Sequence, residues 1–377
     1  MSTLFNIIHE LETIAKAPEE AIKQAIKETG KKVVGCFPIY SPEEIIYAAG
    51  MLPVGMWGGQ TTGNLANKYL QGFCCSIMKA NTEQALKGDY NCLSAVIMTT
   101  FCDTLKCLME NWKVASPQLN IIPMVYAQNR KIEAGKIFMI EEFERVKKEL
   151  EKVAGHSISE RDLTEAIDIY DDYRKTMQEF VDLAADHPSI FNATTRHLVI
   201  KAAYFMDKKV YTEKIKALIK EIKGLEIEKE SHMKKIILTG LISEPIGFLQ
   251  LLTDNNMYVV ADDLAQETRQ FRTISPNNGT AFERMAERIA MQDGCTFLFD
   301  IEKTRGQKLI EMKTKYNADA IIFCQLKFCD PDEFDYPILK KQMEKAEIPM
   351  LYIELEQQMD SLEQLRTRIQ SFAEMLS

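Results

Sequence analysis

The amino-acid sequence predicts an α/β fold of two doubly wound parallel-sheet lobes with a helical insert between them. Two similar segments support this prediction. Residues 94–106 (SAVIMTTFCDTLK) and 319–333 (DAIIFCQLKFCDPDE) each lead from a short apolar, β-branched run into Phe-Cys-Asp. Between them, residues 138–224 show helical periodicity and no strand signal. Because the other strand signals alternate with helix-length segments, we expect parallel sheets in both lobes.

The length of 377 residues exceeds that of one ordinary core and predicts several domains. We place an N-terminal α/β lobe with a leading helix at 1–137, a helical domain at 138–232 and a C-terminal α/β lobe at 233–377. No window approaches the roughly 18 uncharged apolar residues of a membrane span, and the first residues lack a signal-peptide pattern. We therefore expect a cytoplasmic protein. A net charge of -9 without a basic stripe argues against nucleic-acid binding.

The N-terminal lobe begins with a helical segment at residues 3–29 that we expect to break near Pro18. The sequence SPEE at 41–44 predicts a helix start, with Ser41 as the N-cap and Glu44 returning a bond to it. This helix would run to about Gly50. The other predicted elements are strands at 33–36, 53–57, 94–98 and 121–125 and helices at 73–87 and 103–112.

The C-terminal lobe begins at Lys234 and repeats the alternation. Its segment KKIILTGLISEPIGFLQLL keeps the order of KKVVGCFPIYSPEEIIYAAG, namely Lys-Lys, strand, loop, Pro and helix, which indicates a loose internal duplication. The predicted strands are 236–240, 257–263, 295–299, 319–323 and 350–355. The predicted helices start at 244, span 280–291, 304–316 and 336–346, and close the chain up to 376.

Nine cysteines do not indicate a disulfide framework in a cytoplasmic chain, so they are either buried apolar residues or metal ligands. Cys102 and Cys329 follow the carboxyl ends of predicted strands, where open parallel sheets bind ligands. Neither belongs to a C-x2-C pair, so zinc-ribbon and ferredoxin spacings are absent. A metal site built from dispersed cysteines has to be assembled by the fold, and the residues alone leave both interpretations open.

Other catalytic patterns are absent from the sequence. It contains no phosphate loop, no G-x-S-x-G and no H-E-x-x-H, and the loop GGQTTG is interpreted as a flexible turn. We expect Glu44, Trp57 and Gln60 to face the cleft between the lobes. Arg305 is interpreted as a solvated helix start, with a phosphate contact as the alternative. The histidines are interpreted as surface or structural residues: His9, His156, His187, His197 and His232.

Several segments resemble the beta-type subunit of 2-hydroxyacyl-CoA dehydratases, in the same order and along nearly the whole chain. They are CFPIYSPEEIIYAAGMLPVGMWGG, FCCSIM, FCDTLK, ADDLAQETRQFR, LKFCDPDEFDYPILKK and LRTRIQSFAEML. The resemblance implies one 4Fe-4S cluster bound by Cys75, Cys102 and Cys329. Cys74 is the alternative to Cys75. The other cysteines are interpreted as core residues, with Cys107 and Cys324 as spare ligand candidates that lie in the core or beside the ligands.

The resemblance also implies a reaction and its partners. The reaction is syn elimination of water from an (R)-2-hydroxyacyl-CoA through a ketyl radical anion, because the β-proton is barely acidic and an ordinary side-chain base cannot remove it. The implied partners are an alpha-type subunit, which forms a heterodimer with this chain, and an ATP-dependent iron-sulfur activator. A bound flavin is left open. The alternatives are a benzoyl-CoA-reductase-like subunit and a cofactor-free, two-lobed small-molecule binding protein.

One geometric expectation follows for the three proposed ligands. If the two Phe-Cys-Asp units end equivalent strands in facing lobes, Cys102 and Cys329 converge across the cleft and the helix start at Cys75 joins them. Their sulfurs then surround a cluster without bonding one another. We expect Asp103 and Asp330 to turn away from an anionic cluster and to cap the helices that follow.

Overall fold

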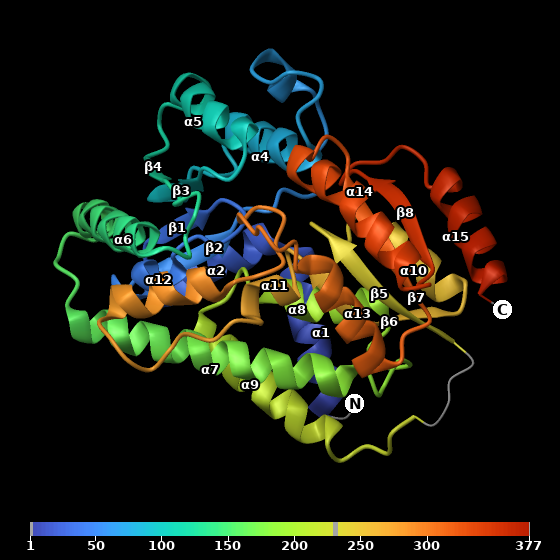
Figure 1. Cartoon of the computed structure of the whole chain (residues 1–377). Helices are drawn as coiled ribbons and strands as arrows, with labels where there is room; N and C mark the ends of the chain where they lie inside the picture. The colour runs from blue at the N-terminus through green and yellow to red at the C-terminus, as the bar shows by residue number, and fades with distance from the viewer. Residues whose placement is uncertain (1–2, 229–232, 377) are drawn as a thin grey trace.

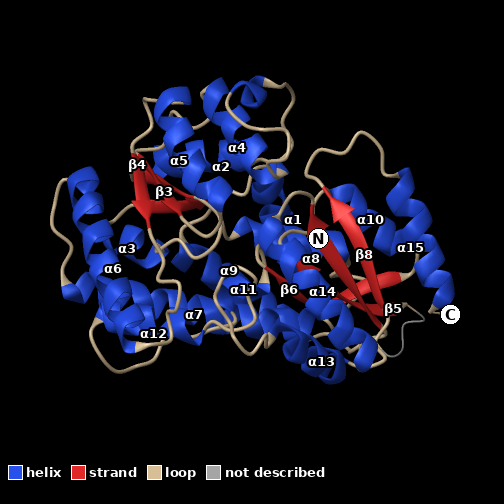
Figure 2. Ribbon diagram, turned by 45° about the horizontal axis from the view of Figure 1, so that its top comes forward, coloured by secondary structure: helices blue, strands red, loops and turns tan. Residues whose placement is uncertain are grey.

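The computed structural model describes residues 3–228 and 233–376, and it confirms the predicted α/β class. The strands form two four-stranded parallel sheets (Figure 1). Figure 2 shows the strands as two separate groups, each surrounded by helices. None of the helices in these ranges combines the length and the apolar character that a bilayer crossing requires.

The N-terminal sheet has the strand order β2-β1-β3-β4, with all neighbours parallel. Its central strands are fully buried, as expected for a parallel sheet that is covered by helices on both faces. The strands are β1 (Val33–Cys36), β2 (Leu52–Gly55), β3 (Ala95–Thr99) and β4 (Ile121–Met124). The helices among them are α3 (Glu43–Ala48), η1 (Leu65–Lys68), α4 (Ser76–Lys87) and α5 (Asp103–Ala115).

The leading segment breaks at Ala17, as predicted, because Pro18 begins a second helix. Helix α1 packs against α8 and α9, and its buried residues belong to the same apolar cluster as theirs. The division into 1–137, 138–232 and 233–377 stays a prediction, and its second boundary adjoins residues outside the described ranges. The helices are α1 (Thr3–Lys16), α2 (Pro18–Thr29), α6 (Glu133–Ala154), α7 (Glu160–Ala184), α8 (Ala193–Ala202) and α9 (Lys208–Ile222).

The C-terminal sheet has the order β6-β5-β7-β8, which repeats the order of the first sheet strand for strand. This agrees with the loose duplication in the sequence. Helix α12 leaves its own lobe and packs against α6. The strands are β5 (Lys234–Gly240), β6 (Met257–Leu264), β7 (Ala320–Leu326) and β8 (Met350–Leu355). The helices are α10 (Ile246–Asp254), α11 (Thr268–Phe271), α12 (Ala281–Met291), α13 (Arg305–Tyr316), α14 (Asp330–Lys345) and α15 (Glu363–Met375).

Three local predictions are wrong. Residues 295–299 are not a strand, because Gly294 has a φ of +66° and Leu298 donates to the Cys295 carbonyl, which folds the segment into a turn. Helix α14 begins at Asp330, six residues earlier than predicted. Ser41 does not cap α3, because its hydroxyl donates to the Phe37 carbonyl at 2.9 Å.

Candidate functional site

A cavity is lined by residues from the carboxyl ends of strands in both sheets. In each sheet the strand order reverses between the first and third strands, that is between β1 and β3 and between β5 and β7. Ligands of open parallel sheets bind outside such switch points. The residues that follow these four strands supply most of the wall: Pro38, Ile39, Cys102, Thr104, Leu105, Leu241, Phe328, Cys329, Asp330 and Pro331.

Cys75, Cys102 and Cys329, hereafter the three cavity cysteines, all line this cavity. Each is the residue immediately before a helix, namely α4, α5 and α14, and the amide of Leu105 donates to the Cys102 sulfur at 3.4 Å. The free N–H groups of a helix N-terminus favour negative charge. Three N-termini at one cavity therefore suit thiolate ligands and an anionic cluster.

The three thiols shift one another's pKa values and form no disulfide bonds. Burial raises the pKa of Cys75 to about 12, and the neighbouring thiol of Cys102 adds to this. Burial also raises the pKa of Cys329 well above its ordinary value, with contributions from Asp332, Cys75 and Cys102. All nine cysteines are free. Buried thiols near one another become stable thiolate ligands only with a compensating cation, which is what a metal cluster supplies.

Thiols at helix N-termini around one cavity are suitable donors for an iron-sulfur cluster. Within residues 3–228 and 233–376, no group of three or more His, Cys, Asp or Glu side chains is placed to hold one metal ion. The sulfur ligands of a four-iron cube lie on different irons and are farther apart than ligands of one ion. The fit rests on the three thiols at helix N-termini within one cavity.

The doubled cysteine resolves into one residue inside the cavity and one beside it. Cys75 lines the cavity, whereas the Cys74 thiol lies 3.8 Å from the side-chain oxygen of Gln71. Among the remaining cysteines, Cys324 is buried in β7. Cys107 is exposed on α5, so the interpretation of this residue as part of the core is wrong. Cys36 and Cys295 are buried as expected, and Cys92 is only partly buried.

The two aspartates that follow the cavity cysteines do not cap their helices. Cys102 and Cys329 occupy the N-cap positions themselves, and each aspartate is the first helical residue. Asp103 does turn away, with 92% of its side chain exposed and a weak pair to Lys106 at 3.2 Å. Asp330 is exposed at the rim of the cavity. The Cys102 sulfur accepts the first-turn amide of Leu105, whereas Cys329 makes no side-chain cap bond.

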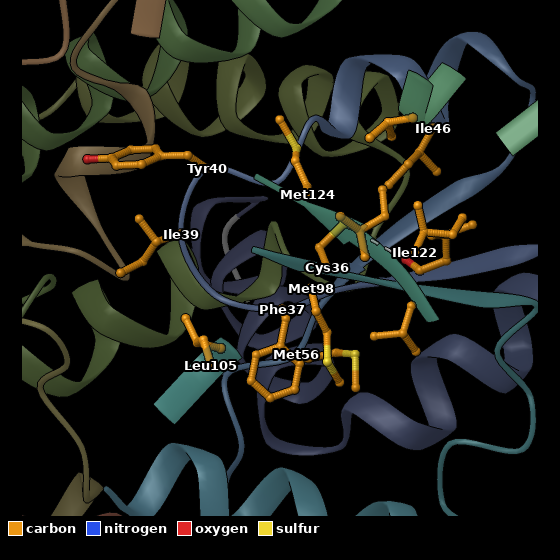
Figure 3. Close-up of a cluster of buried hydrophobic side chains, with 14 of the residues drawn as sticks. Cys36, Phe37, Ile39, Tyr40, Ile46, Met56, Met98, Leu105, Ile122 and Met124 are labelled. Atoms are coloured by element: carbon orange, nitrogen blue, oxygen red, sulfur yellow. Dashed lines mark hydrogen bonds between the residues drawn. The ribbon is translucent and has the colours of Figure 1, made fainter. Parts of the chain in front are cut away.

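An apolar cluster with members from both lobes adjoins the cavity. Figure 3 shows part of it, including Cys36 at the end of β1, Phe37 directly after it and Met98 of β3. Figure 3 places Ile39 and Tyr40 at one end of this cluster, away from Ile46 and Ile122. This is the end at which Ile39 reaches the cavity wall. One side of the site is therefore a buried, apolar core.

Glu44 is neither a helix cap nor part of the cysteine cavity. It is 1% exposed and forms ion pairs with Arg174 and, at 3.0 Å, with Arg288. Burial opposes ionisation, but Arg288 and Arg174 outweigh it and lower the pKa of Glu44 to about 2. The carboxylate thus joins α3, α7 and α12 in a separate polar pocket. Of the other two residues expected at the cleft, Trp57 lines the cavity and Gln60 donates to the Gln357 carbonyl.

Arg305 is buried, so its interpretation as a solvated helix start is wrong. Its guanidinium donates to Asp263 at 3.0 Å, to Asp332 at 2.8 Å and to Thr239 at 2.9 Å. Asp332 lies in the first turn of α14, three residues after Cys329. Arg305 therefore anchors the helix start that carries one cavity cysteine to the sheet beneath it.

Gln357, which the sequence does not mark, joins the two lobes beside the cavity. Its amide N–H donates to the hydroxyl of Ser76 at 3.1 Å, directly after Cys75. Its side-chain nitrogen donates to the Trp57 carbonyl and to Glu244, both at 2.8 Å. These partners are distant in sequence, so no local pattern could have identified the residue.

The four described histidines are not among the residues of the cavity wall. His197 is buried, with its Nδ1 at 2.9 Å from Glu267 and 3.0 Å from the Ser243 hydroxyl. His187 is also buried, His9 and His156 are exposed, and His232 lies outside the described residues. The interpretation of the described histidines as surface or structural residues agrees with these positions.

Comparison with known proteins identifies the family. A family model described as "2-hydroxyglutaryl-CoA dehydratase, D-component" matches residues 38–376. The chain is 43% identical to the (R)-phenyllactyl-CoA dehydratase beta subunit of Clostridium sporogenes and 42% identical to the lactoyl-CoA dehydratase subunit beta of Anaerotignum propionicum, each over 100% of both chains.

Two more distant relatives also match along most of their length. Identity is 34% to the (R)-2-hydroxyglutaryl-CoA dehydratase subunit beta of Acidaminococcus fermentans, over 98% of this chain and 99% of that one. It falls to 22% for one of the subunits of the benzoyl-CoA reductase of Thauera aromatica, over 92% and 91%. With a family model over most of its length and full-length relatives above 30% identity, this chain belongs to the 2-hydroxyglutaryl-CoA dehydratase D-component family.

Proposed function

We propose that this chain is the beta-type subunit of an iron-sulfur enzyme that removes water from an (R)-2-hydroxyacyl-CoA. The observation that carries the proposal is the cavity between the lobes, which gathers three cysteines from α4, α5 and α14. We further propose that these three cysteines bind one 4Fe-4S cluster. When bound, the cluster supplies one-electron chemistry, which suits a substrate whose β-proton is barely acidic.

The residues of this chain have a structural part in that reaction. The three helix N-termini hold the sulfurs in place and favour their negative charge. Much of the remaining wall is apolar, with Pro38, Ile39, Leu241 and Phe297 among its members, so it excludes water from the sulfurs. Three cysteines leave one iron of a cube without a cysteine ligand, and the described residues of the cavity wall do not include a fourth cysteine.

The partners are part of the proposal. The relatives are named as beta subunits, which supports an alpha-type subunit as the partner of this chain. We propose that the alpha-type chain meets the thioester and that this chain assists by relaying the electron. A separate ATP-dependent iron-sulfur activator supplies it, in keeping with the absence of a phosphate loop from the sequence.

Two alternatives make different predictions. A benzoyl-CoA-reductase-like subunit would consume two electrons per turnover, and the lower identity of 22% to that relative speaks for the dehydratase. A cofactor-free binding protein would need no iron, and three thiols at helix N-termini around one cavity speak against it.

The test is an anaerobic co-purification of this chain with an alpha-type subunit. The pair is assayed with activator, ATP, a reductant and a panel of (R)-2-hydroxyacyl-CoA thioesters, and the 2-enoyl-CoA product is measured. We expect the pair to turn over without net electron consumption, and we expect this chain alone to show no turnover. Turnover by the isolated chain would overturn the division of labour, net two-electron reduction would favour the reductase, and an iron-free, colourless chain would favour the binding protein.

A further inference from the structure

A strained turn precedes Cys329. The Cys329 amide donates to the Leu326 carbonyl at 2.9 Å, which closes a four-residue turn from 326 to 329. Its third residue, Phe328, has a φ of +64°. This position with positive φ is normally occupied by Gly or Asn, because a larger residue crowds its own backbone there. The turn therefore holds a bulky aromatic residue where glycine would be easier.

The ring of Phe328 reaches across the cavity to the other lobe. It lines the cavity with the three cavity cysteines and packs against the apolar cluster, which has members from both lobes. The Lys79 and Lys327 ammonium groups lie 5.6 Å and 5.3 Å from its ring centre, within the range of a cation–π contact. Lys79 is one turn after Cys75 on α4 and donates to the Gly72 carbonyl at 2.7 Å. The ring is thus held between the Cys329 turn and the Cys75 helix.

A second strained residue comes from the opposite lobe. Ile39, in the loop after β1, has a φ of +72°, and Tyr40 follows with +57°. Positive φ is rarest for β-branched residues such as isoleucine. Tyr40 is fixed by a bond from Gln292 to its hydroxyl at 2.9 Å and by a bond from Tyr126 to its carbonyl. Ile39 is buried and lines the same cavity as Phe328.

Each lobe thus contributes one strained apolar residue to the cavity of the three cysteines, and we expect both to have the same cause. Backbone outliers persist where surrounding structure fixes them, and they concentrate at functional sites. We propose that the side chains of Phe328 and Ile39 form an apolar cover that restricts access of water and small solutes to the three cavity cysteines. The left-handed backbone conformations are what place these side chains over the sulfurs. That the cover protects a cluster rests on the proposed function. That the cover shields the three cysteines does not depend on it.

The test measures how fast each cysteine reacts with a small maleimide. The iron-free, full-length chain is labelled in short pulses under native conditions, because thiolates bound to iron would not react, and each cysteine is quantified by mass spectrometry. Phe328→Gly removes the ring and relieves the backbone strain, and Phe328→Leu retains apolar bulk. Glu347→Gly is the matched control, because Glu347 has a φ of +54° at an exposed position outside the cavity. Cys107 and Cys324 serve as exposed and buried internal references.

We expect Phe328→Gly to label the three cavity cysteines about tenfold faster, the change that about 1.4 kcal/mol of lost closure produces. Phe328→Leu and Glu347→Gly should label them at close to the wild-type rate, and both reference cysteines should stay unchanged in all variants. Wild-type labelling of the cavity cysteines in Phe328→Gly would overturn the proposal. So would an equal acceleration at Cys324, because that would report opening of the whole lobe.

A second measurement uses the anaerobically purified complex with the alpha-type subunit. Iron loss to a chelator should be faster in Phe328→Gly than in wild type and Glu347→Gly. Because maleimide labelling needs no iron, it decides on the cover even if the chain holds no cluster. Conversely, retention of iron after loss of a cavity cysteine would contradict the proposed function and leave the cover standing.

Discussion

Cys102 and Cys329 occupy equivalent positions in the two lobes and line the same cavity. Each is the N-cap of the helix that follows the third strand of its sheet, β3 in one lobe and β7 in the other. Cys75 reaches this point differently, through the start of α4. The internal duplication therefore accounts for two of the three thiols, and the third is an addition of the N-terminal lobe.

The first prediction concerns the ligand set. Serine at Cys75, Cys102 or Cys329 should remove most of the iron from the anaerobically purified chain, because a hydroxyl is a poor replacement for a thiolate on iron. Iron and acid-labile sulfide per chain are the measurement.

The matched controls for this set are serine at Cys74, Cys92 and Cys295. Cys74 is the sharpest of them, since it adjoins Cys75 but lies outside the cavity wall. These variants should keep wild-type iron. Equal loss of iron in both sets of variants would show that the three cavity cysteines are not the iron ligands.

The second prediction concerns Glu44. Glu44→Gln should lower the free energy of unfolding in urea at pH 7 by about 3–5 kcal/mol, the cost of leaving a buried charge without its partner. Here Arg288 is the charge left without a partner, while Arg174 keeps its buried pair with Asp171. Glu110→Gln is the control, because its pair with Lys113 is exposed and should contribute less than about 1 kcal/mol. Similar losses in both variants would contradict the buried pairing.

The same carboxylate gives the third prediction, a dependence on pH. The pKa of Glu44 in the folded chain, about 2, lies below its ordinary value of 4.5. Its stabilisation is therefore complete above pH 4.5 and is lost as the pH falls toward 2. Unfolding free energies measured from about pH 5 down to about pH 3 should fall more steeply for wild type than for Glu44→Gln. Parallel curves would refute this.

The fourth prediction concerns Arg305. Arg305→Ala should destabilise the chain by about 3–5 kcal/mol, because the buried Asp332 loses its ion-pair partner, whereas Asp263 keeps its pairs with Arg269 and Arg272. Lys303→Ala is the control, since that lysine is about half exposed and lies 3.6 Å from Asp335. It should change the free energy of unfolding by less than about 1 kcal/mol. Urea unfolding of the two variants side by side measures the contrast, and a mild effect of Arg305→Ala would mean that Asp332 is solvated.

The fifth prediction tests the contact between the lobes. A Cβ on Gly58 would lie 2.5 Å from the side-chain oxygen of Gln357, and Gly58 has a φ of +78°. Gly58→Ala should therefore cost about 1–3 kcal/mol in strain, and Gln357→Ala about 1–3 kcal/mol in lost hydrogen bonds. The double variant should lose less unfolding free energy than the two single variants lose together, because Gln357→Ala removes the oxygen that the new Cβ at position 58 would meet. Strict additivity in urea unfolding would show that the two residues do not touch.

The sequence by itself determined the elements and the likeness between the lobes. Apolar runs with β-branched residues identify β3 and β7, and Phe-Cys-Asp after each run marks Cys102 and Cys329 as related positions. These signals are local, since hydrophobic period and turn chemistry depend on residues a few places apart. The strand wrongly predicted at 295–299 shows where local signals fail. A short apolar run has the same pattern in a strand as in a turn that packs on α14. Gly294 is the one local sign of the turn.

Only the tertiary structure decided the roles of the charged and strained residues. The sequence favours a cap role for Glu44 because its neighbours Ser41 and Pro42 suit one, whereas its partners Arg174 and Arg288 lie 130 and 244 residues away. Likewise, the positive φ of Ile39 and Phe328 has no sequence signal, because residues of those types ordinarily avoid it. Long-range contacts and backbone strain arise when the lobes pack together, and no spacing along the chain encodes them.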